Sequence, residues 1–170
     1  MMRYLLYLIL YIMMQVIAYL ITPILPSLAV FAEGWSDNHS IRRVEPRLPL
    51  WPSWFDTPDN SLYGDDNFMC QHNKGYWSQV IWLYRNSLYG FKWSVLAAPS
   101  PALLCLKGEL AELDYHKRKF GSMWLHAGSY WQWKCVRPLG SKILILNFGW
   151  LLEDASQTKA LFMFSPRLKG

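Results

Sequence analysis

The chain has 170 residues, a formal net charge of +5 and 52% hydrophobic residues, a size that fits one domain with a short appendage. Its three cysteines (Cys70, Cys105 and Cys135) are odd in number and widely spaced, which excludes a disulfide framework and a zinc signature. The modest basic excess comes without a nucleic-acid recognition module, so nucleic acid is not an expected partner.

The N-terminal segment predicts a membrane helix. The run from Tyr4 to Ile21 carries no charge, and Gln15 is its one strongly polar side chain. Eighteen residues at about 1.5 Å each give roughly 27 Å, just enough for the hydrocarbon core of a bilayer. The prolines that follow predict that the helix ends or kinks near residues 22–25. Residues 1–32 are therefore expected to be a single-pass anchor whose partner is the lipid bilayer.

A stripe of polar and aromatic side chains runs along this predicted helix. The spacing places five of them on one face: Tyr4, Tyr7, Tyr11, Gln15 and Thr22. Tyr19 is a further tyrosine of the anchor. One interpretation is a helix–helix contact, either by self-association or with another membrane protein. The other is chance spacing combined with the preference of tyrosine for the membrane interface.

A cleaved signal peptide is the alternative to an anchor. Arg3 would form its charged n-region, and residues 30–32 (Val-Phe-Ala) place small residues at a cleavage site. The apolar run is longer than the about 7–15 residues usual in such signals, which favours retention. Basic residues lie on both sides of the helix, so the positive-inside rule gives no orientation.

Residues 33–55 are expected to be a linker rich in proline and tryptophan. Its recurring prolines forbid regular helix and favour an extended path. The linker ends in an aromatic cluster: Trp51, Trp54 and Phe55. These rings could lie at the lipid headgroups or form the lid of a core, and both interpretations stay open.

Residues 56–170 are expected to form one soluble α+β domain. Residues 56–73 are rich in turn-forming residues. Apolar positions at helical spacing predict a short amphipathic helix over 75–87, closed by a glycine stop at Gly90.

Alternating patterns predict strands in the C-terminal part of the chain. Apolar and polar residues alternate in three segments: 131–135, 143–150 and 160–164. Three others are candidates for further strands: 103–107, 112–119 and 122–126. Together they predict an antiparallel meander of four to six strands with the 75–87 helix packed on one face. Cys105 and Cys135 are expected as small core residues, although an exported domain could hold one disulfide of open pairing.

The loop over 56–73 holds the best candidates for chemistry. Close carboxylates can divide acid and base roles, or they can bind a hard cation. The catalytic candidates are Asp56, Asp59, Asp65 and His72. The metal candidates are Asp59, Asp65, Asp66 and His72. No cofactor is indicated.

The same loop also has a purely structural interpretation. An EF-hand starting at Asp59 would put Tyr63 at position five and Cys70 at position twelve, where oxygen ligands are required, so that match fails. In the alternative, the carboxylates cap the backbone of a turn-rich loop or pair with Arg47 or Arg85.

Two segments carry a resemblance to known proteins: RLPLWPSWFDTPDNSLYGD (47–65) and GYWSQVIWLYRNSLYGFKW (75–93). With the apolar N-terminal helix and a strand-rich end containing NFGW, the chain resembles a family of small uncharacterised proteins encoded by tailed bacteriophages. Tyr63 departs from the family pattern, which has an acidic or small residue there. The resemblance implies a phage origin and a place in the inner membrane of the bacterial host, but no mechanism.

Three hypotheses follow. The leading one is a phage-encoded, membrane-anchored interaction protein without enzymatic activity, which acts at the host envelope, for example on a host membrane protein. The second is a small hydrolase or metal-dependent enzyme that uses the acidic loop. The third is a periplasmic domain exported after signal cleavage.

Overall fold

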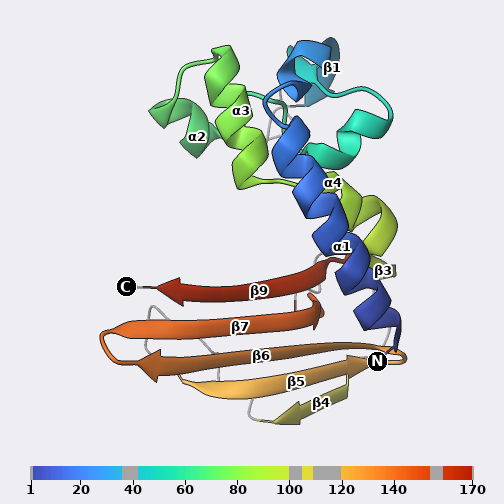
Figure 1. Cartoon of the computed structure of the whole chain (residues 1–170), viewed down its shortest axis with the longest axis vertical. Helices are drawn as coiled ribbons and strands as arrows, with labels where there is room; N and C mark the ends of the chain where they lie inside the picture. The colour runs from blue at the N-terminus through green and yellow to red at the C-terminus, as the bar shows by residue number, and fades with distance from the viewer. Residues whose placement is uncertain (1, 36–41, 100–104, 109–119, 154–158, 170) are drawn as a thin grey trace. The chain divides into compact units, whose positions relative to one another are not determined.

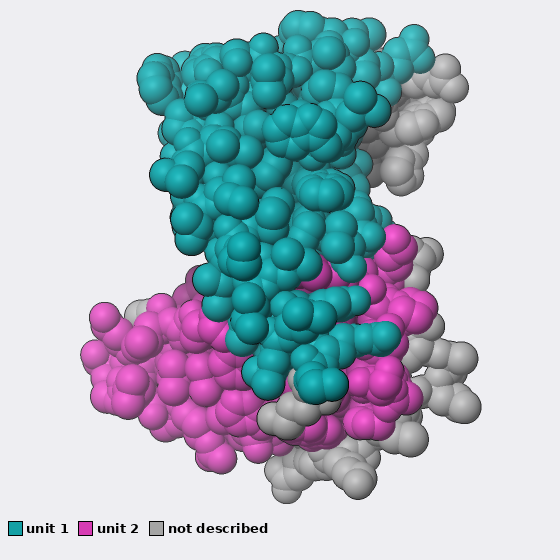
Figure 2. Space-filling model, turned by 45° about the vertical axis from the view of Figure 1, so that its right-hand side comes forward, with its two compact units in different colours: residues 1–95 teal, residues 96–170 magenta. Residues whose placement is uncertain are grey.

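The computed structural model describes residues 2–35, 42–99, 105–108, 120–153 and 159–169. The chain divides into two compact units, residues 1–95 and residues 96–170. Figure 1 traces their elements, and Figure 2 colours the two units separately. Helices dominate the first unit and an antiparallel sheet dominates the second, so the predicted α+β class is confirmed. The functional division into anchor, linker and soluble domain stays a prediction.

The predicted N-terminal helix is confirmed as α1 (Met2–Ile21). It ends where expected, because Pro23 cannot continue the hydrogen-bond ladder and disfavours helical geometry at the residue before it. The carbonyl of Ala18 accepts hydrogen bonds from both the amide of Thr22 at 2.9 Å and its hydroxyl at 2.6 Å. A short 3-10 helix, η1 (Leu25–Leu28), follows.

The linker region contains an antiparallel pair of strands, β1 (Val30–Trp35) and β2 (Arg42–Arg47). The register aligns Val30 with Arg47 and Trp35 with Arg42. The extended backbone predicted for this region is present, but its strands are hydrogen-bonded to each other. Proline spacing reports local backbone preference and carries no information on such pairing. A 3-10 helix, η2 (Trp51–Phe55), comes next.

Three helical segments and one π-helical turn complete the first unit. They are α2 (Asp66–Gln71), α3 (Tyr76–Arg85), α4 (Tyr89–Phe91) and η3 (Lys92–Leu96). The predicted helix over 75–87 is confirmed as α3. The short helix α2 was not predicted, because Asp, Asn and Gly at its start suit turns and helix caps equally well.

The predicted glycine stop at Gly90 is wrong. α3 ends at Asn86, and Leu88 takes the left-handed conformation that follows, with φ 61°. Gly90 lies in α4, where its amide donates to the carbonyl of Asp56 at 2.8 Å. A Cβ on Gly90 would lie 2.2 Å from the carbonyl oxygen of Ser53. The missing side chain therefore allows α4 to approach the backbone of η2.

The second unit is built on a five-stranded sheet in the order β4-β5-β6-β7-β9. All neighbours are antiparallel, so the predicted meander is confirmed. Its strands are β4 (Cys105–Gly108), β5 (Gly121–Ala127), β6 (Tyr130–Leu139), β7 (Lys142–Trp150) and β9 (Phe162–Lys169). A separate antiparallel pair of short strands is formed by β3 (Ala98–Pro99), before β4 in the chain, and β8 (Lys159–Ala160), between β7 and β9. The candidate strand over 112–119 lies outside the described residues.

Turns and a break delimit these strands. Gly128 and Gly140 have positive φ values of 58° and 61° in the short loops that enter and leave β6, where glycine suits tight hairpins. The predicted last strand is interrupted, because Ala160 belongs to β8 and Phe162 begins β9. Between them, the carbonyl of Leu161 accepts a hydrogen bond from the amide of Leu151 at 2.8 Å.

The sheet has one buried face and one partly exposed aromatic face. The register aligns Trp124, Trp133, Phe148 and Phe164 across four strands. Trp133 stacks on Phe148 with ring centroids 5.8 Å apart, while Trp124 and Phe164 are 39% and 38% exposed. The opposite face carries the buried residues Met123, Leu125, Gln132, Val136 and Asn147.

Candidate functional site

Asp56 is the most unusual of the predicted acidic residues, because only 4% of its surface is exposed. It follows η2, and its carboxylate accepts hydrogen bonds from the amides of Thr57 at 2.8 Å and Leu48 at 3.4 Å. Burial raises the pKa of Asp56 from 3.8 to about 6, although these amides and the charge of Arg47 oppose the shift. Such a carboxyl can exchange a proton close to neutral pH.

Arg47 binds the backbone of the loop that follows Asp56. Its Nη1 donates to the carbonyl of Asn60 at 3.2 Å and, more weakly, to that of Pro58 at 3.4 Å. The predicted pairing of Arg47 with the loop is therefore made largely through backbone carbonyls. Arg85 is exposed, and its guanidinium lies 5.8 Å from the centroid of the Trp82 ring. In the described part of the chain, Arg85 therefore lies on Trp82 and does not make the predicted pair with the acidic loop.

The other candidates have local structural roles. Asp65 is the N-cap of α2, and its Oδ1 accepts from the amide of Phe68 at 2.7 Å. Asp66 is exposed in the first helical turn, where the helix dipole favours a carboxylate. His72 stacks on Phe68 with ring centroids 4.0 Å apart, and its Nδ1 lies 3.2 Å from the Phe68 carbonyl oxygen. Asp59 is exposed.

These positions do not form a ligand cage. Within the described parts of the chain, no three His, Cys, Asp or Glu side chains come together so that they could hold a metal ion. Asp56 is buried while Asp59 and Asp66 are exposed, and Asp65 is engaged as a cap. The geometry therefore favours the structural interpretation of the loop, and the catalytic and metal roles stay predictions.

α1 presents two chemically different faces. On the stripe predicted from the sequence, Gln15 Nε2 donates to Ser87 Oγ at 2.6 Å, and Tyr4 and Thr22 are buried. Ala18, which the spacing did not single out, is also fully buried. The opposite face of the helix carries nine exposed aliphatic or methionine side chains, with exposed fractions between 42% and 86%: Met2, Leu5, Leu6, Ile9, Ile12, Met13, Val16, Ile17 and Leu20.

Two tyrosines of α3 bind the backbone at the C-terminal end of α1. The hydroxyl of Tyr84 donates to the carbonyl of Tyr19 at 3.0 Å, and that of Tyr76 donates to the carbonyl of Pro23 at 2.6 Å. The rings of Tyr19 and Tyr84 also lie in contact, with centroids 5.8 Å apart. With the Gln15 bond, these contacts set α3 antiparallel to the second half of α1 (Figure 1).

The aromatic cluster of the linker is divided between surface and core. Trp51 and Trp54 are 59% and 37% exposed, while Phe55 is only 2% exposed. Trp54 packs on Phe91 with centroids 5.4 Å apart, and Trp51 meets Phe55 edge to face. Lipid contact is therefore open to the two tryptophans, whereas Phe55 belongs to the core of the first unit.

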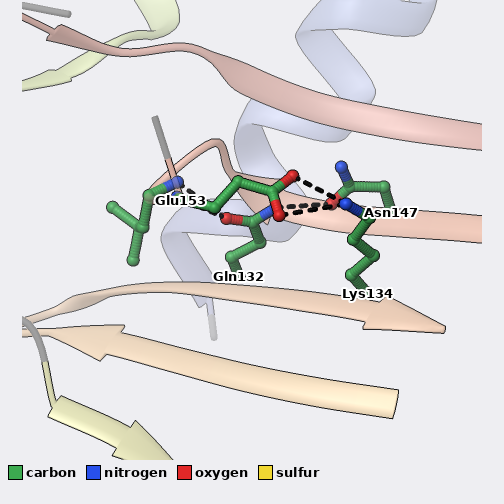
Figure 3. A network of polar contacts seen from close by, with 5 residues as sticks. Gln132, Lys134, Asn147 and Glu153 are labelled. Carbon is green, nitrogen blue, oxygen red and sulfur yellow. Dashed lines mark hydrogen bonds and ion pairs between the residues drawn. The ribbon is translucent and has the colours of Figure 1, made fainter. Parts of the chain in front are cut away.

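A buried polar network in the second unit was not predicted. The alternation grouped Gln132 with Lys134, but Gln132 is fully buried. Its Oε1 accepts from the amides of Leu152 at 2.8 Å and Glu153 at 3.1 Å, and its Nε2 donates to Asn147 Oδ1 at 3.1 Å (Figure 3). Beside it, Lys134 and Glu153 form an ion pair at 3.0 Å. These hydrogen bonds join β6 to β7 and to the segment after β7.

Two of the three cysteines have side chains that the structure describes, and both are free thiols; the side chain of Cys105 lies outside what is described. Cys70 is an exposed free thiol in α2, and Cys135 is a buried free thiol in β6. The expectation that Cys135 is a small core residue is confirmed.

A family model covers almost the whole chain. Residues 1–168 match the model described as a family of unknown function, DUF7338. The chain belongs to the DUF7338 family. No curated protein and no solved structure matches it. The match includes α1 as well as the acidic loop and the sheet, so the sequence shared within DUF7338 extends over the apolar helix.

Within this DUF7338 chain, α1 is the one described helix long and apolar enough to cross a membrane. Length and composition allow either a membrane span or an N-terminal signal sequence. The surface of α1, and not the acidic loop, is therefore the feature with the clearest functional content.

Proposed function

We propose that the protein is attached to a membrane through α1, which is retained in the mature chain, and that it acts at the bacterial envelope as a non-enzymatic interaction protein. The observation that carries the proposal is the division of α1 into one face packed on the first unit and one exposed aliphatic face.

The exposed face of α1 favours lipid as its environment. Nine aliphatic or methionine side chains on one helix leave a contiguous apolar surface far larger than an ordinary soluble surface tolerates. Each such side chain gains about 1.5–3 kcal/mol on full burial, so transfer of half-exposed residues to lipid contributes on the order of 10 kcal/mol. These side chains gain no such free energy while they remain in water.

The packed face of α1 favours retention over cleavage. Removal of the chain before Glu33 would take away the buried residues Ala18, Thr22 and Leu25. It would also remove half of β1, since residues 30–32 are paired with residues 45–47 of β2. Finally, it would leave two tyrosine hydroxyls of α3 without their acceptors, the carbonyls of Tyr19 and Pro23. A segment meant to be discarded does not need such contacts.

The finer parts of the proposal rest on the resemblance described above. The likeness to small proteins of tailed bacteriophages supports a phage origin and the inner membrane of the host. The use of Asp65 and His72 in local contacts supports an interaction role over hydrolysis. The host partner would be a membrane protein at the same envelope.

Fractionation of expressing cells and the intact mass of the chain test the attachment. The expected result is a full-length chain that stays in the membrane pellet after alkaline carbonate extraction. The variant Leu6→Gln/Ile9→Gln/Met13→Gln should move to the soluble fraction, because it makes the exposed face of α1 polar. The three positions are exposed, so the fold of the first unit should be kept. Its matched control is Val44→Gln/Leu139→Gln/Leu168→Gln, which changes three exposed apolar residues elsewhere and should stay in the pellet.

A soluble mature product that begins at Glu33 would overturn the anchor and would favour an exported periplasmic domain. The interaction role is tested by purification from detergent-solubilised host membranes. One stoichiometric membrane protein supports it, and repeated recovery of the chain alone contradicts it.

A further inference from the structure

The outward face of α3 is apolar, although α3 is not part of the predicted anchor. Trp77 and Ile81 are 70% and 48% exposed, and their spacing places them on one side of the helix. Tyr84, 37% exposed, lies at the edge of this side against Tyr19 of α1. The inward side is apolar as well, because Val80, Trp82 and Leu83 are buried. A surface helix in water has a polar outward face. Arg85 is the one charged residue among the exposed side chains of α3, so most of its outward side is apolar where water would favour polar residues.

The position of α3 relative to α1 identifies what covers this face. Before Gln15, which bonds Ser87, α1 has 13 described residues, which span roughly 20 Å. A hydrocarbon core of about 30 Å needs about 20 residues, so the second half of α1 must lie at membrane depth as well. Tyr84 of α3 donates to the carbonyl of Tyr19 in that half, and Tyr76 donates to the carbonyl of Pro23 just beyond it. An α1 that spans the membrane would therefore bring α3 to the same bilayer.

The charges around α3 select the lipid type. The helix contains no acidic residue. Lys74 lies just before it and Arg85 at its last turn, and both are exposed, although each also lies over an aromatic ring (Tyr63 and Trp82). Long cationic side chains of this kind extend to lipid phosphates while their stems stay on apolar surface. Tryptophan and tyrosine favour the same headgroup level.

We propose that α3 lies in an anionic bilayer beside the second half of α1, with Trp77 and Ile81 against lipid and with the side chains of Lys74 and Arg85 extending toward its phosphates. This inference rests on the proposed function, because it takes the attachment of α1 as given. It changes the picture of the anchor from one isolated span to a joint surface of α1 and α3.

Site-specific probes on the full chain test this inference. The chain carries an environment-sensitive label at a single introduced cysteine, in a background whose three native cysteines are replaced by alanine. It is reconstituted in vesicles of phosphatidylcholine with phosphatidylglycerol. The test positions are Ile81→Cys and Trp77→Cys, both exposed. Ile9→Cys on the exposed face of α1 reports attachment, and Asp59→Cys on the exposed loop reports water. Circular dichroism compares the fold of each labelled chain with the parent.

The expected result is that quenchers on the lipid reduce the signal at 77 and 81 as strongly as at 9, while aqueous iodide acts only at 59. At equal lipid concentration, a larger fraction of the chain should pellet with vesicles that contain phosphatidylglycerol than with vesicles of phosphatidylcholine alone; equal fractions overturn the anionic part. Iodide quenching at 81 with lipid quenching at 9 overturns the role of α3 and leaves the anchor intact. Protection of 81 from both quenchers also overturns it, because a protein then covers the face. Iodide quenching at 9 refutes the anchor itself.

Discussion

Replacement of Asp56 by asparagine should make the stability of the first unit less sensitive to pH. Burial raises the pKa of Asp56 from 3.8 to about 6, so between these values the folded state keeps a proton that the unfolded state has lost. Stability therefore falls as pH rises through this window, and the full penalty is present above pH 6. A shift of about 2 units corresponds to about 3 kcal/mol at 1.36 kcal/mol per unit.

Asp56→Asn carries no charge and escapes this penalty, but it keeps only one carbonyl oxygen for the amides of Thr57 and Leu48. That second effect costs about 1 kcal/mol and does not vary with pH. The unfolding free energy of the variant minus that of the parent should therefore increase by up to about 3 kcal/mol between pH 4 and pH 7.

Denaturant titrations of the chain in detergent, repeated across that pH range, measure this difference. Asp66→Asn is the control, since it removes one exposed carboxylate from the same loop. A difference that stays constant with pH would refute the reasoning. A difference that decreases as the pH rises would show that the charge of Arg47 outweighs burial and that Asp56 is a conventional ion-pair partner.

Three further changes test other parts of the structure. Gln132→Met removes three hydrogen bonds, two of them buried, and should lower the unfolding free energy by about 2–5 kcal/mol in denaturant titration. Lys134→Met, which breaks only the partly exposed pair with Glu153, should cost at most about 1 kcal/mol, and equal losses would contradict the network. A double-mutant cycle of Gln15→Leu and Ser87→Ala should give a coupling of about 0.6–1.5 kcal/mol in thermal or denaturant unfolding, and strict additivity would mean that their hydrogen bond contributes nothing. Gly90→Ala should lower stability by about 1–3 kcal/mol or more, since its Cβ would meet the backbone of η2, whereas Gly140→Ala in an open turn should cost about 1 kcal/mol.

Local periodicity was sufficient to predict α1, α3 and the antiparallel meander. In each case one residue type recurs over enough positions that the repeat exceeds chance, as in the aliphatic run of α1 and the alternation of β7. The end of α1 was predictable because proline acts on its own backbone.

Features that depend on distant contacts were not predictable from such patterns. Gly90 resembled a helix stop, but its function is a close approach to residues almost forty positions earlier. Gln132 resembled a polar surface residue, but its partners lie on β7 and on the segment after it. The acidic loop attracted chemical hypotheses because four carboxylates are close in sequence, yet the fold buries one and exposes or caps the others.

The polar stripe of α1 bears directly on how this protein could contact another membrane protein. From the sequence, Gln15 and Thr22 were candidates for hydrogen bonds across a helix–helix interface. In the structure both are used within the chain, by Ser87 and by the carbonyl of Ala18. An interface built on this stripe would first have to break the Gln15 bond and expose Thr22, which is now buried. Interhelical hydrogen bonds in membranes contribute only about 0.6 kcal/mol on average, so such an exchange has little to drive it. We therefore expect self-association or a host contact to use the aliphatic side of α1, where close packing rather than polar pairing would decide the partner.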